Sequence, residues 1–140
     1  MKRFLTCFFS FLLTATLFCG FANAADTRAS YYLSSYDAFL YTGDSSGELI
    51  LDFSVAVTRA CTSYGISKVR LYTEDGDLVK TITGTKTNGL LTGSGRTYLS
   101  EYEISSTAGE SYYAVVTFYA SDANGSDSKT YTTNVAMVKR

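Results

Sequence analysis

The residue types that usually perform chemistry are few in this chain. The sequence contains no histidine, which removes Ser-His-Asp and Cys-His catalysis and every histidine-ligated metal site. Two of its three cysteines, Cys7 and Cys19, fall in an apolar N-terminal segment, so Cys61 is the lone thiol of the remaining chain. A thiol becomes a nucleophile beside a cation or a helix N-terminus. We interpret Cys61 as a thiol without a chemical role, with an intermolecular disulfide as the alternative.

Two groups of acidic residues invite a catalytic or metal-binding interpretation. Glu101 and Glu103 share one face of a predicted strand, whereas a glycosidase needs two carboxyl groups at a set separation across a cleft. Asp122, Asn124 and Asp127 bring oxygen atoms together, but the regular acids and distal glutamate of an EF-type calcium loop are missing. We therefore expect a solvated strand face and a hairpin turn. The chain is predicted to be no enzyme, with no catalytic residue, metal site or cofactor.

Tyrosine is the distinctive residue type, with 12 in the chain. Tyrosine combines rigid apolar area with a polar tip, which suits binding surfaces, although packing alone also favours it in strands. Alternation along a strand from Tyr112 places part of the tyrosines outward, with Lys68 and Arg70 on the predicted neighbouring strand. The predicted ligand-binding residues are Tyr72, Tyr113, Tyr119 and Tyr131. A polysaccharide or an extracellular protein is the expected partner.

The elements that position these residues are predicted to be strands. Apolar and polar residues alternate with a period of two, most clearly where Leu49, Leu51, Phe53, Val55 and Val57 share one face. Gly, Asn, Asp and Ser interrupt the alternation at close spacing, as in a sandwich, and a loop is predicted at 85–95. The predicted strands are 28–34, 36–42, 48–58, 66–73, 78–83, 98–105, 112–120 and 128–137. Seven or eight such strands predict an all-β, antiparallel β-sandwich.

The N-terminus has the pattern of an export signal. Lys2 and Arg3 precede an apolar run at 4–18, and Ala22-Asn23-Ala24 forms a small-residue cleavage site. A membrane anchor, the alternative, needs about 20 apolar residues. We predict a cleaved signal peptide at 1–24 and a single domain at 25–140, secreted and without stable membrane insertion.

Charge narrows the partners of the predicted domain. The leader holds two of the 12 basic residues and none of the 13 acidic ones, which leaves the domain a net charge of −3. Because no basic block is present, nucleic acid is not an expected partner.

Two resemblances follow from particular residues. The segment from Gly109 through Tyr112 and Ala120 to Ser128 resembles the end of a fibronectin type III domain, within the immunoglobulin-like class. That resemblance implies that the hydroxyl of Tyr112 bonds back to the preceding corner. Segments such as Arg28-Ala29-Ser30 and Ser111–Ala120 make the chain similar to a family of short secreted bacterial proteins of Gram-positive type. This second resemblance implies compartment and fold, and it carries no functional residue.

The sequence therefore predicts a secreted, non-enzymatic binding or interaction module. A structural or self-assembling extracellular protein is the first alternative, and a small secreted toxin or inhibitor is the second.

Overall fold

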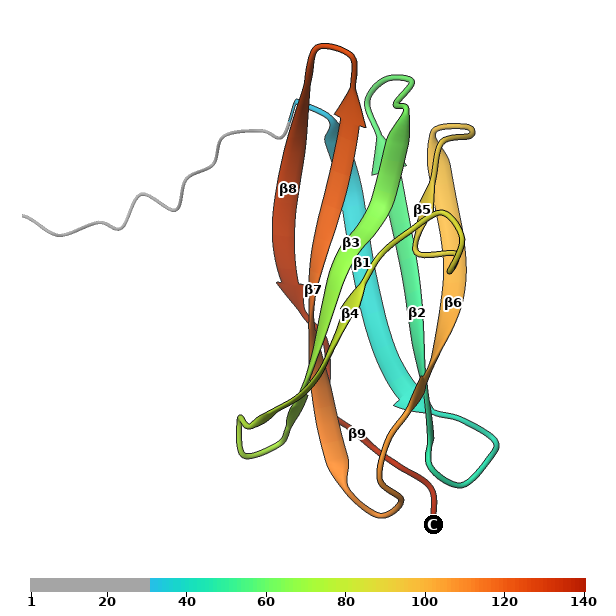
Figure 1. The fold of residues 1–140 in the computed structure, drawn as a ribbon, viewed down its shortest axis with the longest axis vertical. Coiled ribbons are helices and arrows are strands. Elements are labelled where there is room, and N and C mark those ends of the chain that lie inside the picture. The colour runs from blue at the N-terminus through green and yellow to red at the C-terminus, as the bar shows by residue number, and fades with distance from the viewer. Residues whose placement is uncertain (1–30) are drawn as a thin grey trace, which may run out of the picture.

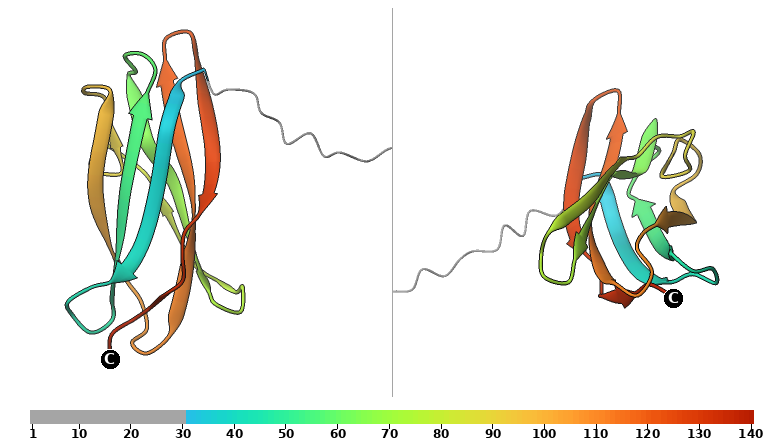
Figure 2. Two further views of the ribbon diagram at one scale, coloured as in Figure 1. Left: turned by 180° about the vertical axis from the view of Figure 1, so that it is seen from behind. Right: turned by 60° about the horizontal axis from the view of Figure 1, so that its bottom comes forward.

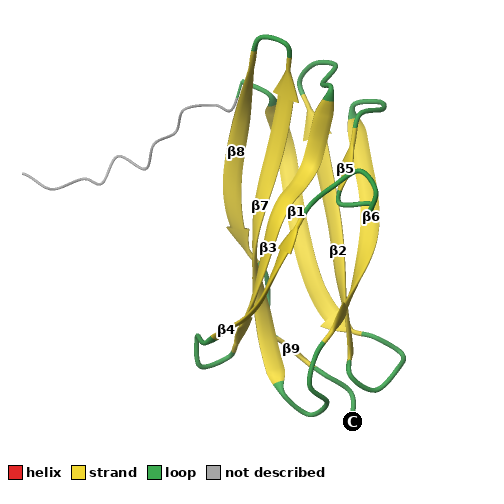
Figure 3. Ribbon diagram, viewed as in Figure 1, coloured by secondary structure: helices red, strands yellow, loops and turns green. Residues whose placement is uncertain are grey.

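The computed structural model describes residues 31–140, and the predicted leader at 1–24 lies outside the described residues. Figure 3 shows that the regular elements of this part are all strands. Between residues 31 and 140, no helix has the length and apolar character of a membrane span. The strands form two antiparallel sheets packed as a sandwich, which confirms the predicted fold class.

The first sheet contains three strands in the order β1-β2-β6. Their bounds are Leu33–Thr42 for β1, Glu48–Val57 for β2 and Thr97–Ser105 for β6. Phe39 stands opposite Asp52, and Asp52 stands opposite Glu101. Residues in register across the three strands point to the same face, so this row lies on one side of the sheet.

The second sheet follows the order β4-β3-β7-β8. Its bounds are Ser63–Thr73 for β3, Leu78–Thr83 for β4, Ser111–Asp122 for β7 and Gly125–Thr132 for β8. Two short strands extend it, since β5 (Leu91–Thr92) pairs with β3 and β9 (Ala136–Met137) pairs with β7. The two sheets lie face to face (Figure 1), and the view from behind has the β1-β2-β6 sheet in front (Figure 2).

The core lies between the sheets and is built from alternate residues of each strand. The predicted row on β2 is buried, with no member more than 5% exposed: Leu49, Leu51, Phe53, Val55 and Val57. Val116 and Phe118 of β7 are fully buried on the facing sheet. A one-residue slip of either strand would move its apolar row into solvent, so the burial of these rows sets the register.

Tyr112 closes the turn that leads into β7. Its side chain is buried, and its hydroxyl accepts a hydrogen bond from the backbone N–H of Thr107 at 3.3 Å. The contact returns to the corner before the strand, as the resemblance implied for this residue.

The chain between β4 and β6 differs from the prediction of a plain loop. The carbonyl of Leu90 accepts a hydrogen bond from the N–H of Ile66 at 2.7 Å, and Leu91 then pairs with Gly65. A Cβ on Gly65 would collide with the Leu90 carbonyl, and Gly65 has a φ of 136°. The short strand β5 therefore depends on Gly65 in β3. Alternation within one segment does not reveal the effect of a glycine on a neighbouring segment.

Two further strand boundaries differ from the prediction. The described part of the predicted strands 28–34 and 36–42 is the single strand β1. The predicted strand 128–137 is divided into β8 and β9, because Thr133 leaves the ladder. Its Oγ1 accepts a hydrogen bond from the N–H of Ala114 at 2.9 Å and donates one to the carbonyl of Asn134 at 2.9 Å.

Asn134 fastens the edge of the first sheet to the second. Its Oδ1 accepts a hydrogen bond from the N–H of Leu40 at 2.9 Å, and its Nδ2 donates one to the carbonyl of Leu40 at 2.6 Å. Leu40 is fully buried on β1, which is an edge strand. The asparagine amide thus stands where the peptide group of a further strand would pair.

Replacing Asn134 with alanine should lower the free energy of unfolding by about 2–6 kcal/mol, because two backbone groups lose their partner at roughly 1–3 kcal/mol each. Asn124→Ala is the control, since Asn124 uses its backbone N–H in the β7–β8 turn. The control should change stability by less than about 0.5 kcal/mol. Urea unfolding measures both, and equal effects would contradict the role of the Asn134 amide.

Candidate functional site

Alternation leaves every second side chain of each sheet pointing away from the core. We call the outer side of β1-β2-β6 the acidic face, with outward residues Asp37, Phe39, Tyr41, Ile50, Asp52, Ser54, Leu99, Glu101 and Glu103. We call the outer side of β4-β3-β7-β8 the tyrosine face, with outward residues Lys68, Arg70, Tyr72, Tyr113, Val115, Thr117, Tyr119, Ser128, Thr130 and Thr132. These two faces lie on opposite sides of the sandwich (Figure 2).

Tyr72 and Tyr113 come together on the tyrosine face. They stand opposite each other on β3 and β7, and their rings stack with centroids 5.4 Å apart and an interplanar angle of 12°. Both side chains are half-buried. Because the rings cover each other, each leaves only its remaining face and its hydroxyl for a ligand.

Tyr119 shares the tyrosine face but lies far from this stacked pair. It is six residues from Tyr113 along β7, a spacing of roughly 20 Å in an extended strand. Tyr119 stands opposite Gly65, where an aromatic side chain compensates for the one that glycine lacks. The predicted tyrosine row is therefore two separate positions.

Tyr131 lies on the other side of the sheet from the predicted surface. It pairs with the buried Val116, and its ring packs against Phe118 and Tyr36 with centroids 6.3 Å and 6.5 Å away. A hydrogen bond to Asp37 raises the pKa of Tyr131, and burial and the charge of that carboxylate raise it further. The placement of Tyr131 on the tyrosine face is wrong, because its position on β8 has the inward phase of the alternation.

The tyrosine face carries positive charge alone. Arg70 stands opposite Val115 and Lys68 opposite Thr117, so both cations lie between the Tyr72–Tyr113 pair and Tyr119. None of the outward residues that define this face is acidic. The predicted basic neighbours of the outward β7 row are thus where alternation places them.

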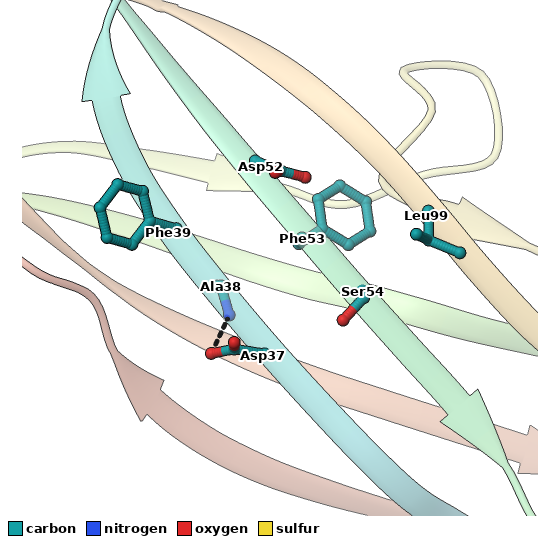
Figure 4. Close-up of a pocket in the computed structure, with 7 residues that line it drawn as sticks. All are labelled: Asp37, Ala38, Phe39, Asp52, Phe53, Ser54 and Leu99. Atoms are coloured by element: carbon teal, nitrogen blue, oxygen red, sulfur yellow. Dashed lines mark hydrogen bonds between the residues drawn. The ribbon is translucent and has the colours of Figure 1, made fainter.

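The acidic face carries a shallow hollow that the sequence analysis missed. It has a volume of about 200 Å³ and runs across all three strands. Figure 4 shows Phe39 on one side and Leu99 on the other, with Asp52 between them. Phe39 is 54% exposed and Leu99 is 70% exposed, so these two apolar side chains point away from the core into solvent. Both share the outward phase of acidic residues on their own strands, and this phase could have revealed the surface.

Carboxylates surround the apolar side chains of this face. Asp37 and Asp52 line the hollow, and Glu101 and Glu103 follow Leu99 on β6. No lysine or arginine occurs anywhere in β1, β2 or β6. The hydroxyl of Tyr41 donates a hydrogen bond to Oε1 of Glu101 at 2.8 Å.

The ionisation of Tyr41 reflects this concentration of negative charge. Its hydrogen bond to Glu101, then burial, then the charges of Glu101, Asp52 and Asp44 raise the pKa of Tyr41 to about 12. Each of the charges that act on Tyr41 is a carboxylate. The acidic face thus disfavours a further negative charge and favours a cationic group.

The acids of the β7–β8 turn serve the fold. Oδ1 of Asp122 accepts hydrogen bonds from the Tyr32 hydroxyl at 2.9 Å and the Asn124 N–H at 2.7 Å. Oδ2 of Asp127 accepts one from the N–H of Tyr32 at 2.9 Å. The N–H of Asn124, more than any other group, lowers the pKa of Asp122. Together these contacts hold the start of β1 against the end of the second sheet.

Cys61 is a buried thiol, 7% exposed, with its Sγ 3.5 Å from the carbonyl oxygen of Arg59. Burial raises the pKa of the Cys61 thiol, and the charge of Asp122 adds to the rise while Arg59 opposes it. A raised pKa keeps the sulfur protonated and weakens it as a nucleophile.

The two faces differ in the ligands they can hold. The acidic face offers carboxylates around exposed apolar side chains, a set that suits cationic groups on apolar stems. The tyrosine face offers phenol rings, hydroxyls and two cations, a set that suits polar or anionic groups. Comparisons with protein-family models, curated proteins and solved structures found no match to this chain.

Iodoacetamide should alkylate Cys61 of the folded protein at pH 8 at less than about a tenth of the rate seen in urea, because only the thiolate reacts. Mass spectrometry after quenching measures the modified fraction over time. Equal rates for folded and unfolded protein would contradict the burial and raised pKa of this thiol.

Stability should fall as pH rises from about 10 to about 12. The unfolded chain releases the Tyr41 proton near pH 10, whereas the folded chain holds it to about 12. The stability that this proton contributes is therefore complete below pH 10 and is lost across that window. The fall in unfolding free energy across these pH values should be shallower in Tyr41→Phe than in the wild type.

Glu101→Gln is the control for the alkaline prediction, because it retains an acceptor for the Tyr41 hydroxyl and removes the charge. Phenolate absorbance should show the Tyr41 titration moving back toward pH 10. An unchanged absorbance titration, or equal slopes for wild type and Tyr41→Phe, would show that Glu101 does not control this group.

Proposed function

We propose that the protein is an extracellular, non-enzymatic binding module and that the acidic face is its main binding surface. The observation that carries this proposal is the exposure of Phe39 and Leu99 around the hollow. Apolar side chains of this size, grouped at a depression and rimmed by charge, are typical of protein interaction sites. The export of the module is proposed from the leader pattern at 1–24.

The chemistry of the acidic face favours a protein partner with basic side chains. Arginine and lysine present a cation on an aliphatic stem, and the hollow offers Asp52 beside two apolar walls. A planar guanidinium matches a carboxylate with two hydrogen bonds. Binding needs no reacting group, and the carboxylates spread over an open surface support a role without catalysis.

A glycan at the tyrosine face is the second candidate. The stacked Tyr72–Tyr113 pair beside Arg70 is the observation that favours it. Tyrosine rings and nearby hydroxyls bind sugars through stacking and hydrogen bonds. Because the rings of Tyr72 and Tyr113 stack on each other, less of their aromatic surface is free to bind a sugar.

We infer that the sandwich is of the immunoglobulin-like, fibronectin III-like type. The support is the division of strands, with β1, β2 and β6 in one sheet and β3, β7 and β8 in the other. The return of the Tyr112 hydroxyl to the corner before β7 adds to it. In that type of domain, sheet faces and loops carry the binding surfaces.

Capture from the culture medium and surface extract of the producing cells tests the proposed surface. A protein partner retained by the immobilised wild type should be lost by a Phe39→Ser, Leu99→Ser double variant. A Val135→Ser, Met137→Ser variant is the control, because it removes two other exposed apolar side chains, 49% and 60% exposed, that belong to neither face. Retention of the same proteins by all three would place the binding surface elsewhere.

A further inference from the structure

The two outer faces are opposite in charge. Every charged side chain that defines the acidic face is a carboxylate, and its three strands contain no lysine or arginine. The two charged side chains that define the tyrosine face are Lys68 and Arg70. Because the faces lie on opposite sides of one sandwich, each molecule presents a negative and a positive surface in opposite directions (Figure 2).

We propose that the acidic face of one copy docks onto the tyrosine face of a second copy. This inference rests on the proposed function, since it names the partner of the acidic face. Arg70 of the second copy supplies the cation and aliphatic stem that suit the hollow, with Asp52 as its carboxylate partner. Phe39 and Leu99 then meet the apolar and ring surfaces beside Arg70, which are Val115, Tyr72 and Tyr113.

Charge also decides which faces meet. Two acidic faces would bring Asp37, Asp52, Glu101 and Glu103 against the same residues, and like charges in contact are unfavourable. Two tyrosine faces would oppose Lys68 and Arg70 in the same way. The attractive contact is therefore heterologous, head to tail, and such a contact continues into an open chain of molecules unless its rotation closes a ring.

The size of the faces sets the strength of this contact. Strands of nine to eleven residues and a sheet of three or four strands give a surface of roughly 35 Å by about 15 Å. This is on the order of 500 Å² for each copy, below the area of a stable interface of about 800 Å² for each partner. The association is accordingly weak, dependent on concentration and sensitive to salt.

Sedimentation velocity tests the association directly. The wild type should form dimers and larger species as its concentration rises toward about 1 mM, the range of a weak contact. Raising salt from about 0.1 M to about 1 M shortens the screening length from ~10 Å to ~3 Å and should return it to monomer. A wild type that stays monomeric at low salt throughout this range would overturn the proposal.

Two double variants, each with two side chains replaced by uncharged polar ones, block one face each. Asp52→Asn with Leu99→Asn alters the acidic face, and Lys68→Gln with Arg70→Gln alters the tyrosine face. Each should weaken self-association at least about tenfold. Lys80→Gln with Lys129→Gln is the matched control, because these lysines pair with the buried Leu71 and Phe118 and so have the inward phase. A control as weak as the tyrosine-face variant would contradict the assignment of this face.

Mixing the two blocked variants gives the decisive result. One retains an intact tyrosine face and the other an intact acidic face, so the mixture should form a one-to-one dimer and nothing larger. Formation of that dimer also shows that both variants are folded. Absence of the dimer where the wild type associates, or self-association of either variant at wild-type strength, would overturn head-to-tail docking.

The outcomes separate this inference from the proposed function. A monomeric wild type whose captured partner still depends on Phe39 and Leu99 would retain the acidic face as a binding surface and exclude self-docking. Head-to-tail dimers without any captured foreign partner would make the second copy the ligand of that surface.

Discussion

The structure depends on one constraint of extended backbone, which is that neighbouring residues of a strand must point to opposite sides. Two sheets that pack on a shared core bury half of these side chains, as the buried row from Leu49 to Val57 shows. The remaining half must face outward whatever its chemistry. In this domain the outward residues of one sheet carry carboxylates and those of the other carry cations. The same constraint that builds the core therefore also creates two surfaces of opposite charge.

Side chains, rather than a disulfide, hold β1 to the rest of the sandwich. Tyr32 reaches Asp122 and Asp127 at the start of the strand, and Asn134 pairs with Leu40 in its middle. Both attachments join segments more than 85 residues apart in the chain. β1 also carries Asp37 and Phe39, whose side chains line the hollow on the outer face of this sheet. The contacts that hold β1 in place therefore also position one wall of the hollow.

Much of this arrangement could be predicted from the sequence, because alternation reports burial directly. It identified the β2 row and the outward Tyr72 and Tyr113, while the burial of Tyr112 was expected from the resemblance to a fibronectin type III corner. It failed for Tyr131, because the β7–β8 hairpin pairs Tyr131 with the buried Val116 and not with an outward residue of β7. It did not identify Phe39 and Leu99 as a surface, because single outward apolar residues in a strand carry no signal by themselves. Only the pairing of the three strands shows that these two residues line one hollow.

The isolation of Cys61 has a consequence for how the chain acquires its structure. Residues 31–140 hold one thiol, Cys61, and the sequence holds no proline, so within this part of the chain neither disulfide exchange nor prolyl isomerisation can retard folding. The remaining obstacle is the search for distant pairing partners, as when Glu48 finds Ser105. Residues 31–140 can therefore fold without an oxidase or an isomerase, at a speed set by their topology.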